Sequence, residues 1–227
     1  MTPARRATVL SATWAAESLE LRWPEKTQLT QLRTLCKVCD MSAPHTLQPT
    51  LWRTCRVLAN RARLRMFGLL VQQPDQTVSA VAQHFNLPLP VASQYLRAME
   101  ARGLLTARRT GSRVSYRVSE PEAAGPVSPL LEALRLAFQR ESNPGEAIFK
   151  LATAFTHPRR LALFRALGAG ARTAAQLREA TRISHDAVWR HLAKLEARGF
   201  VARRARTYEL VSQRDGVARA LARLASG

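Results

Sequence analysis

Cys36 and Cys39 are the most direct candidates for metal chemistry in this 227-residue sequence, because Cys-x-x-Cys spacing lets two thiolates reach one metal ion. His45 and Cys55 follow and could complete a set of ligands. No second Cys-x-x-Cys or His-x-x-x-His pair accompanies them, and an isolated pair is a weak signal. Cys55 also falls in phase with neighbouring leucines, which favours a small core residue. We therefore expect no metal site, although Cys36 and Cys39 stay open as an alternative, and we expect no cofactor.

A second set of candidate side chains lies between residues 86 and 119. Ser93, Gln94 and Arg97 are interleaved with apolar residues of helical period, so they point away from the apolar stripe, into solvent or onto a partner. That stripe consists of Ala92, Leu96 and Met99. Gly103 follows where a glycine commonly ends a helix. The pattern predicts a helix with one buried and one polar face.

The same stretch then changes to a period of two. From Leu105 to Val118, apolar residues alternate with arginine, serine and threonine, and Thr110-Gly111-Ser112 supplies a turn. The pattern predicts a two-stranded ribbon with arginines at its tip and flanks. A helix followed by such a ribbon is the order of a winged helix-turn-helix, whose recognition helix enters the major groove of DNA while the ribbon lies along the backbone.

The pattern occurs twice along the chain. Ser184 minus Pro88 gives an offset of 96, and under it Glu100-Ala101-Arg102-Gly103 coincides with Glu196-Ala197-Arg198-Gly199. Upstream, with a slip of one residue, NRARLRMFGLL at 60–70 matches HPRRLALFRAL at 157–167. Composition alone could repeat a short alanine- and arginine-rich run, but not the same order of four helices and a ribbon. We interpret the repeat as a duplicated domain.

Composition restricts the class of partner. Lys and Arg number 35 against 16 Asp and Glu, a formal net charge of +19, which predicts a polyanionic partner. Genomic base bias could contribute to the arginine content, but it does not explain arginines gathered at both ribbons. No apolar run approaches the ~20 residues of a membrane helix. Three cysteines, an odd number, fit a reducing cytoplasm, so we expect a cytoplasmic protein without a membrane partner.

The expected fold is mainly α with small β-ribbons, in tandem winged helix-turn-helix domains. Residues 1–46 show no sustained period, and translation starting at Met41 is an alternative, so residues before it are expected to be dispensable. The first domain is expected at 47–119, with Thr77 capping its third helix. Residues 120–145, rich in proline, are expected to form a linker with a short helix at 129–140. The second domain is expected at 146–212, with Thr173 and Ser184 as caps, and a last helix at 213–227.

With these residues in view, both units resemble the winged-helix domains of ArsR-type bacterial transcriptional regulators. The resemblance rests on the run R-L-x-x-F-x-x-L, on S-x-D-A-V-W-R-H-L-x-x-L-E-A-R-G-F-V in the second unit and on its counterpart at 92–118. MarR-like regulators share the same order of helix and ribbon. The resemblance implies base-edge contacts from Ser93, Gln94, Arg97, Trp189, Arg190 and Lys194. It implies DNA-backbone contacts from Arg108, Arg109, Arg113, Arg203, Arg204 and Arg206.

Each of these assignments has an alternative. An exposed arginine is often only a solvated surface residue. Trp189 could pack against the ribbon instead of contacting a base. His185 and His191 are expected to be surface or packing residues, because no other ligands stand at helical spacing. The helices beside each unit also lack the cysteines or histidines through which many ArsR-type proteins sense metals, so metal sensing is not implied.

The expected function is sequence-specific regulation of transcription on double-stranded DNA, either as an intramolecular pseudo-dimer or as a homodimer. The alternative is a tandem winged-helix scaffold or chromosome-organising protein that grips other proteins, against which the net charge of +19 counts. An RNA partner is disfavoured because A-form RNA closes its major groove to side chains. Nucleotide-loop, hydrolase and zinc-protease motifs are absent from the sequence, so we expect no enzyme.

Overall fold

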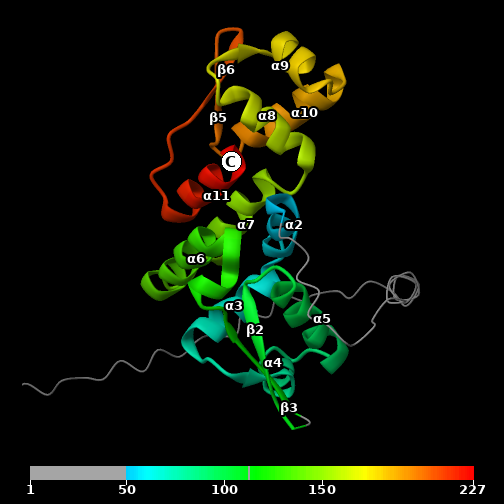
Figure 1. The fold of residues 1–227 in the computed structure, drawn as a ribbon, viewed down its shortest axis with the longest axis vertical. Helices are drawn as coiled ribbons and strands as arrows, with labels where there is room; N and C mark the ends of the chain where they lie inside the picture. The colour runs from blue at the N-terminus through cyan, green and yellow to red at the C-terminus, as the bar shows by residue number, and fades with distance from the viewer. Residues whose placement is uncertain (1–49, 112) are drawn as a thin grey trace, which may run out of the picture. The chain divides into compact units, whose positions relative to one another are not determined.

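A computed structural model describes residues 50–111 and 113–227, and these form one mainly helical unit with two small sheets (Figure 1). Cys36 and Cys39, His45 and the alternative start at Met41 lie outside the described residues. The helices and strands of the first half are α2 (Leu51–Leu58), α3 (Arg61–Gln72), β1 (Gln76–Thr77), α4 (Val78–His84), α5 (Leu89–Glu100), β2 (Leu105–Thr110) and β3 (Arg113–Val118).

The second half follows the same order. After the 3-10 helix η1 (Pro121–Val127) and α6 (Ser128–Arg140), it comprises α7 (Gly145–Ala154), α8 (Pro158–Leu167), β4 (Arg172–Thr173), α9 (Ala174–Thr181), α10 (His185–Glu196), β5 (Val201–Arg204), β6 (Thr207–Leu210) and α11 (Gly216–Ser226). The sheets correspond as well, with strand orders β1-β3-β2 and β4-β6-β5, all antiparallel. The expected fold class, mainly α with small antiparallel β-ribbons, is confirmed.

The expected two-stranded ribbons are three-stranded sheets. β1 pairs with β3 through Gln76 and Thr77, and β4 pairs with β6 through Arg172 and Thr173. The sequence could not predict these added strands, because two residues are too few to show an alternating pattern. Each short strand leads directly into the next helix, so it fixes that helix against the wing.

Several local signals act as expected. The Thr77 side chain accepts a hydrogen bond from the Ala80 N–H, and Thr173 forms a complete capping box with Gln176. Gly103 and Gly199, which follow α5 and α10, have φ values of +71° and +76°, a conformation that glycine adopts without strain. Ser184 stands at the N-cap of α10 as expected, but its side chain makes no capping hydrogen bond.

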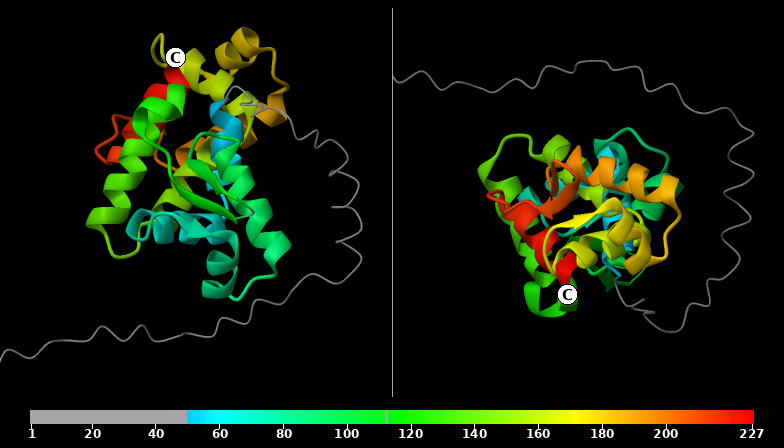
Figure 2. Two further views of the ribbon diagram at one scale, coloured as in Figure 1. Left: turned by 60° about the horizontal axis from the view of Figure 1, so that its bottom comes forward. Right: turned by 90° about the horizontal axis from the view of Figure 1, so that it is seen from above.

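The segment expected to be a linker, 120–145, is part of the packed structure. Ala124 and Val127 of η1 are buried, and α6 buries Leu130, Leu131 and Leu134. α6 packs against α11 and α3, so its apolar face is covered within the chain (Figure 2). Prolines and a glycine predicted a linker here, but the apolar residues of the segment have a partner surface, and burying that surface outweighs the local preference.

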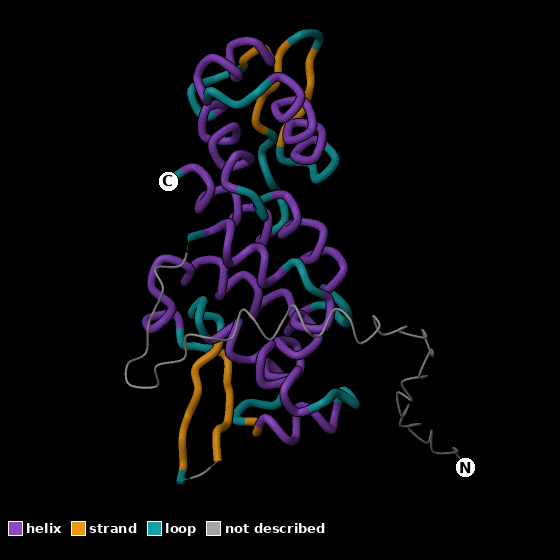
Figure 3. Tube along the Cα trace, turned by 90° about the vertical axis from the view of Figure 1, so that its right-hand side faces the viewer, coloured by secondary structure: helices purple, strands orange, loops and turns teal. Residues whose placement is uncertain are grey.

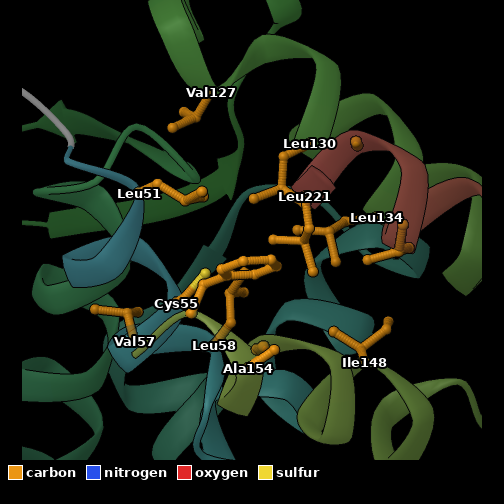
Figure 4. Packing of buried hydrophobic residues seen from close by; sticks show 14 of the residues in the cluster. Leu51, Cys55, Val57, Leu58, Val127, Leu130, Leu134, Ile148, Ala154 and Leu221 are labelled. Atoms are coloured by element: carbon orange, nitrogen blue, oxygen red, sulfur yellow. The ribbon is translucent and has the colours of Figure 1, made fainter. Parts of the chain in front are cut away.

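The core joins the two halves. Leu51 and Leu58 of α2 belong to the same buried cluster as Ile148 of α7, and Leu134 of α6 lies beside Leu221 of α11 in it (Figure 4). Cys55 is fully buried within this cluster, which confirms its expected role as a core residue. Helices α2 and α7 contact each other, and so do α6 and α11, so each helix packs against its counterpart in the repeat. One exposed ion pair also crosses the halves, between Arg61 Nε and Glu146 Oε2 at 2.8 Å.

Candidate nucleic-acid interface

Helix α5 presents one buried and one polar face. Ala92, Leu96 and Met99 are buried, as expected from their spacing. Two prolines fix the start of the helix: Pro88 stands at the N-cap, and Pro90 lies in the first turn, where no intrahelical N–H is needed. The opposite face is therefore held outward by packing on one side and by rigid backbone at the start.

The polar face carries the residues that the sequence singled out. Gln94 and Arg97 are exposed, and Ser93 is half-buried nearer the wing. Beside them Tyr95 is half-buried under the guanidinium of Arg63, which lies 5.1 Å from the ring centroid. The stacked arginine belongs to α3, so this contact helps to fix the rotation of α5 on that helix.

The first wing extends from this helix. Arg108, Arg109 and Arg113 are all exposed on strands of six residues each. At the base of the wing the Tyr116 hydroxyl donates to Glu100 Oε2 at 3.3 Å, which ties β3 to the end of α5. Burial, with the nearby Glu100 carboxylate, raises the pKa of Tyr116 to about 12, so the hydroxyl keeps its proton and donates at neutral pH. The wing arginines therefore extend from a base that is fixed to α5.

A groove of about 600 Å³ lies between α4, the start of α5 and the first wing. Its lining includes Leu89, Ser93 and Arg113. Leu89 is 52% exposed, although it stands three residues before buried Ala92. Sequence reasoning missed Leu89, because its spacing matches the buried stripe; only the packing shows that the core ends one turn later.

Helix α10, the counterpart of α5 in the second half, has a different surface. Val188, Leu192 and Leu195 are buried as expected, and Arg190 is exposed. Trp189 is 37% exposed, and its Nε1 donates to Nε2 of His185 at 2.9 Å. Its ring also meets Tyr208 of the wing edge-on, with centroids 6.1 Å apart. Trp189 therefore packs against the wing while about a third of its surface stays exposed, and contact with a base stays a prediction.

Lys194 lies at the edge of this surface. It is half-buried, and its pKa is lowered by desolvation and by the charges of Arg198 and Arg160. Under the offset of 96, Lys194 corresponds to Ala98, whereas Arg97 corresponds to exposed Ala193. Of the three residues of α10 that the sequence predicted to contact bases, Trp189 and Arg190 are exposed, whereas Lys194 lies at the margin of the same face.

The second wing is shorter and less strongly basic than the first. β5 and β6 have four residues each, and Arg203, Arg204 and Arg206 are exposed. Arg204 Nε is paired with Glu209 Oε1 on the neighbouring strand. The guanidinium carbon of Arg203 lies 5.6 Å from the Trp189 ring centroid. Two of the three wing arginines thus already have partners within the protein. Figure 3 shows both hairpins projecting from the helices (Figure 3).

A basic cluster lies where α8 meets α10, and it consists of His157, Arg159, Arg160 and His191. The His157 and His191 rings are 4.8 Å apart. His157 Nδ1 accepts the Arg159 N–H at the start of α8. Arg160 donates to the carbonyl of Ala154, as Arg63 does to the carbonyl of Val57 in the first half. Desolvation, with the positive charges around it, lowers the pKa of His191 to about 4. The lowered pKa favours the neutral form of His191, which packs against the ring of His157; packing is one of the two roles expected for His191.

The described residues contain no group of three or more His, Cys, Asp or Glu side chains that could hold a metal. Burial raises the pKa of the Cys55 thiol, so a metal-binding thiolate is disfavoured there. Within the same part of the chain, no helix is both long and apolar enough to cross a membrane.

Comparison with known proteins finds a matching family in the second half. A family described as a helix-turn-helix domain matches residues 155–204, which run from the end of α7 to the end of β5. The HTH-type transcriptional regulator Rv0324 of Mycobacterium tuberculosis (strain ATCC 25618 / H37Rv) is 38% identical over 72 residues, which are 32% of this chain and 31% of that protein. The chain thus spans about a third of the length of the curated relative it matches. The family match thus supports a helix-turn-helix domain within the second half of this chain.

Proposed function

We propose that this protein is a transcriptional regulator that binds specific sequences of double-stranded DNA through two winged helix-turn-helix domains of ArsR type. The observation that carries the proposal is the polar face of α5, where exposed Gln94 and Arg97 lie on the helix that is tied to an arginine-rich wing. Glutamine can pair with adenine and arginine with guanine in the major groove, while the wing arginines neutralise phosphates.

The proposed domains are 47–119 and 146–212. The repeated sequence, the matching order of helices and the matching strand order support an origin by duplication. The proposed base-reading residues are Ser93, Gln94, Arg97, Trp189, Arg190 and Lys194. The proposed backbone contacts are Arg108, Arg109, Arg113, Arg203, Arg204 and Arg206.

The proposed DNA-binding form is a single chain that acts as a pseudo-dimer. In a two-fold dimer, the same surface of each subunit meets its copy. The contacts of α2 with α7 and of α6 with α11 have this property within one chain. Such an arrangement would place the two recognition helices ~34 Å apart, about one turn of B-DNA. Because the two reading faces differ, the target would consist of two unlike half-sites.

Selection of bound sequences from random duplexes, combined with sedimentation of the complex, tests the proposal. We expect one chain per duplex and a selected site of two dissimilar halves. A stable dimer on a palindrome would overturn the pseudo-dimer while leaving DNA binding intact. Failure to bind any duplex at low salt would overturn the proposed function and favour the scaffold alternative.

A further inference from the structure

Leu89 is the most exposed of the four large hydrophobic residues that stand exposed in the described part of the chain, at 52%. A single exposed leucine is common on protein surfaces, so its meaning depends on what surrounds it. Here it lies in the first turn of α5, the part of a recognition helix that contacts base edges in helix-turn-helix proteins.

The groove beside Leu89 is apolar with one positive edge. Val78 of α4, Pro90 of α5 and Val114 of β3 contribute apolar surface. Arg113 is the charged residue of the lining, no acidic side chain belongs to it, and Ser93 adds a hydroxyl. This combination disfavours a cationic or strongly polar ligand and suits a negatively charged partner that presents a small apolar group.

Backbone rigidity keeps the leucine in this position. Pro88 and Pro90 flank it, so the backbone around Leu89 has little freedom to fold the side chain back toward the core. Ala92, one turn later, is fully buried. Leu89 thus continues the apolar stripe of α5 beyond the point where the core can cover it, and the exposed surface is open for a partner.

We propose that Leu89 and this groove receive the C5-methyl group of a thymine in the major groove of the duplex, which makes Leu89 a specificity-determining residue of the first half. The proposal rests on the proposed function. Thymine carries the one methyl group among the four bases, and it projects into the major groove, where proteins recognise it by apolar contact. Arg113, which lines the same groove from β3, would then be available to a phosphate.

The second half makes the preference one-sided. Under the offset of 96, Leu89 corresponds to His185, a polar and exposed residue that accepts the hydrogen bond of Trp189. An apolar contact to a methyl group is therefore available from α5 and not from the matching position of α10. The required thymine should fall in the half-site that α5 reads.

The test replaces each thymine of the selected duplex, one at a time, with deoxyuridine, which removes only the methyl group. For the full chain we expect one or two replacements, confined to one half-site, to weaken binding about three- to fivefold, the effect of losing one buried methyl contact. Leu89→Ala should bind more weakly and lose this sensitivity, so thymine and deoxyuridine become equivalent. Leu89→Met, which keeps apolar surface, should retain it.

Leu136→Ala is the matched control, because Leu136 is another exposed leucine, at 39%, on α6. It should preserve the thymine sensitivity of the unmodified chain, and thermal unfolding should show that both alanine variants are folded. Duplex binding that ignores every deoxyuridine replacement, or a sensitivity that persists in Leu89→Ala, would overturn the role of Leu89 while the proposed function stands. If no duplex is bound, the proposed function itself fails.

Discussion

A Cβ atom built on Gly68 would lie 2.8 Å from Cε1 of Phe138. Gly68 is buried in the middle of α3, and Phe138 comes from α6. The ring of Phe138 also packs against the ring of Phe67, with centroids 5.6 Å apart. The missing side chain lets an aromatic ring of α6 close over the helix of the first half. The repeat has Arg165 at the corresponding position, so this close approach belongs to the first half alone.

Gly68→Ala should destabilise the protein despite the higher helix propensity of alanine. The propensity gain is about 1 kcal/mol, whereas overpacking a core contact typically costs about 1–3 kcal/mol. We expect a net loss of about 1 kcal/mol, measured as a melting midpoint roughly 2–4 °C lower. Gly145→Ala, where the new Cβ meets nothing closer than 3.7 Å, is the control and should not lower the midpoint. Adding Phe138→Leu to Gly68→Ala should restore part of the lost stability. An unchanged melting midpoint in the double variant would mean that the ring is not the cause of the loss.

Binding to duplex DNA should weaken steeply with salt. If the two wings and helix ends neutralise about 6–10 phosphates, the slope of log affinity against log salt should be about −5 to −9. Measuring the affinity at salt concentrations from about 50 to about 200 mM gives this slope. A slope near zero would exclude DNA as the principal partner.

The two wings should contribute unequally to that slope. Arg109→Ala should reduce its magnitude by about one, because its exposed guanidinium is expected to neutralise one phosphate. Arg204→Ala should reduce it less, because Arg204 is already paired with Glu209. Glu209→Gln should release that arginine and strengthen DNA binding. Equal effects of the two alanine substitutions, measured at the same salt concentrations, would show that pairing with Glu209 does not reduce the contribution of Arg204 to DNA binding.

Base preference should divide between the halves. Replacing Gln94 and Arg97 with alanine should relax sequence preference in one half-site and leave the other intact. Trp189→Ala should act on the other half-site, because the indole joins α10 to Tyr208 of its wing. Selection from random duplexes with each variant measures both effects. Simultaneous loss of preference in both half-sites would indicate that the two domains do not read separately.

Stability should fall as the pH drops from about 6.5 to about 4. The pKa of His191 lies at about 4 in the folded protein, against 6.5 ordinarily, because burial and nearby positive charges disfavour its protonation. The unfolded chain therefore binds more protons in this window, and the free energy of unfolding rises with pH through it. The contribution is fully present above pH 6.5 and is lost as the pH approaches 4.

His191→Tyr should make this fall smaller, because it removes the imidazole that titrates in this window. Tyrosine is the residue that the first half carries at the corresponding position, Tyr95. His157→Asn, which installs the cap residue of the first half, removes the neighbouring ring and should also reduce the fall. Denaturant midpoints at pH 7 and pH 4.5 measure the difference, with the unmodified protein as reference. A fall of unchanged size in His191→Tyr would show that other groups cause the acid sensitivity.

Local features of the sequence determined the helices, wings and caps of this protein. The apolar stripes of α5 and α10, the caps at Thr77 and Thr173, and the glycines after both recognition helices depend on residues within one or two turns. Periodicity and backbone preference act over that range, so the sequence alone predicts them. Repetition of the pattern then predicted that both halves share one order of elements.

Contacts between distant residues decided the rest. The strands β1 and β4 exist because a wing lies beside them, and the proline-rich segment is ordered because α3 and α11 cover α6. Within the candidate site, exposure of Gln94 and Arg97 follows from helical period. The pairing of Arg204 and the exposure of Leu89 depend on which surfaces meet in space. A period specifies which face of a helix is apolar, but only tertiary packing decides how far along the helix that face is covered.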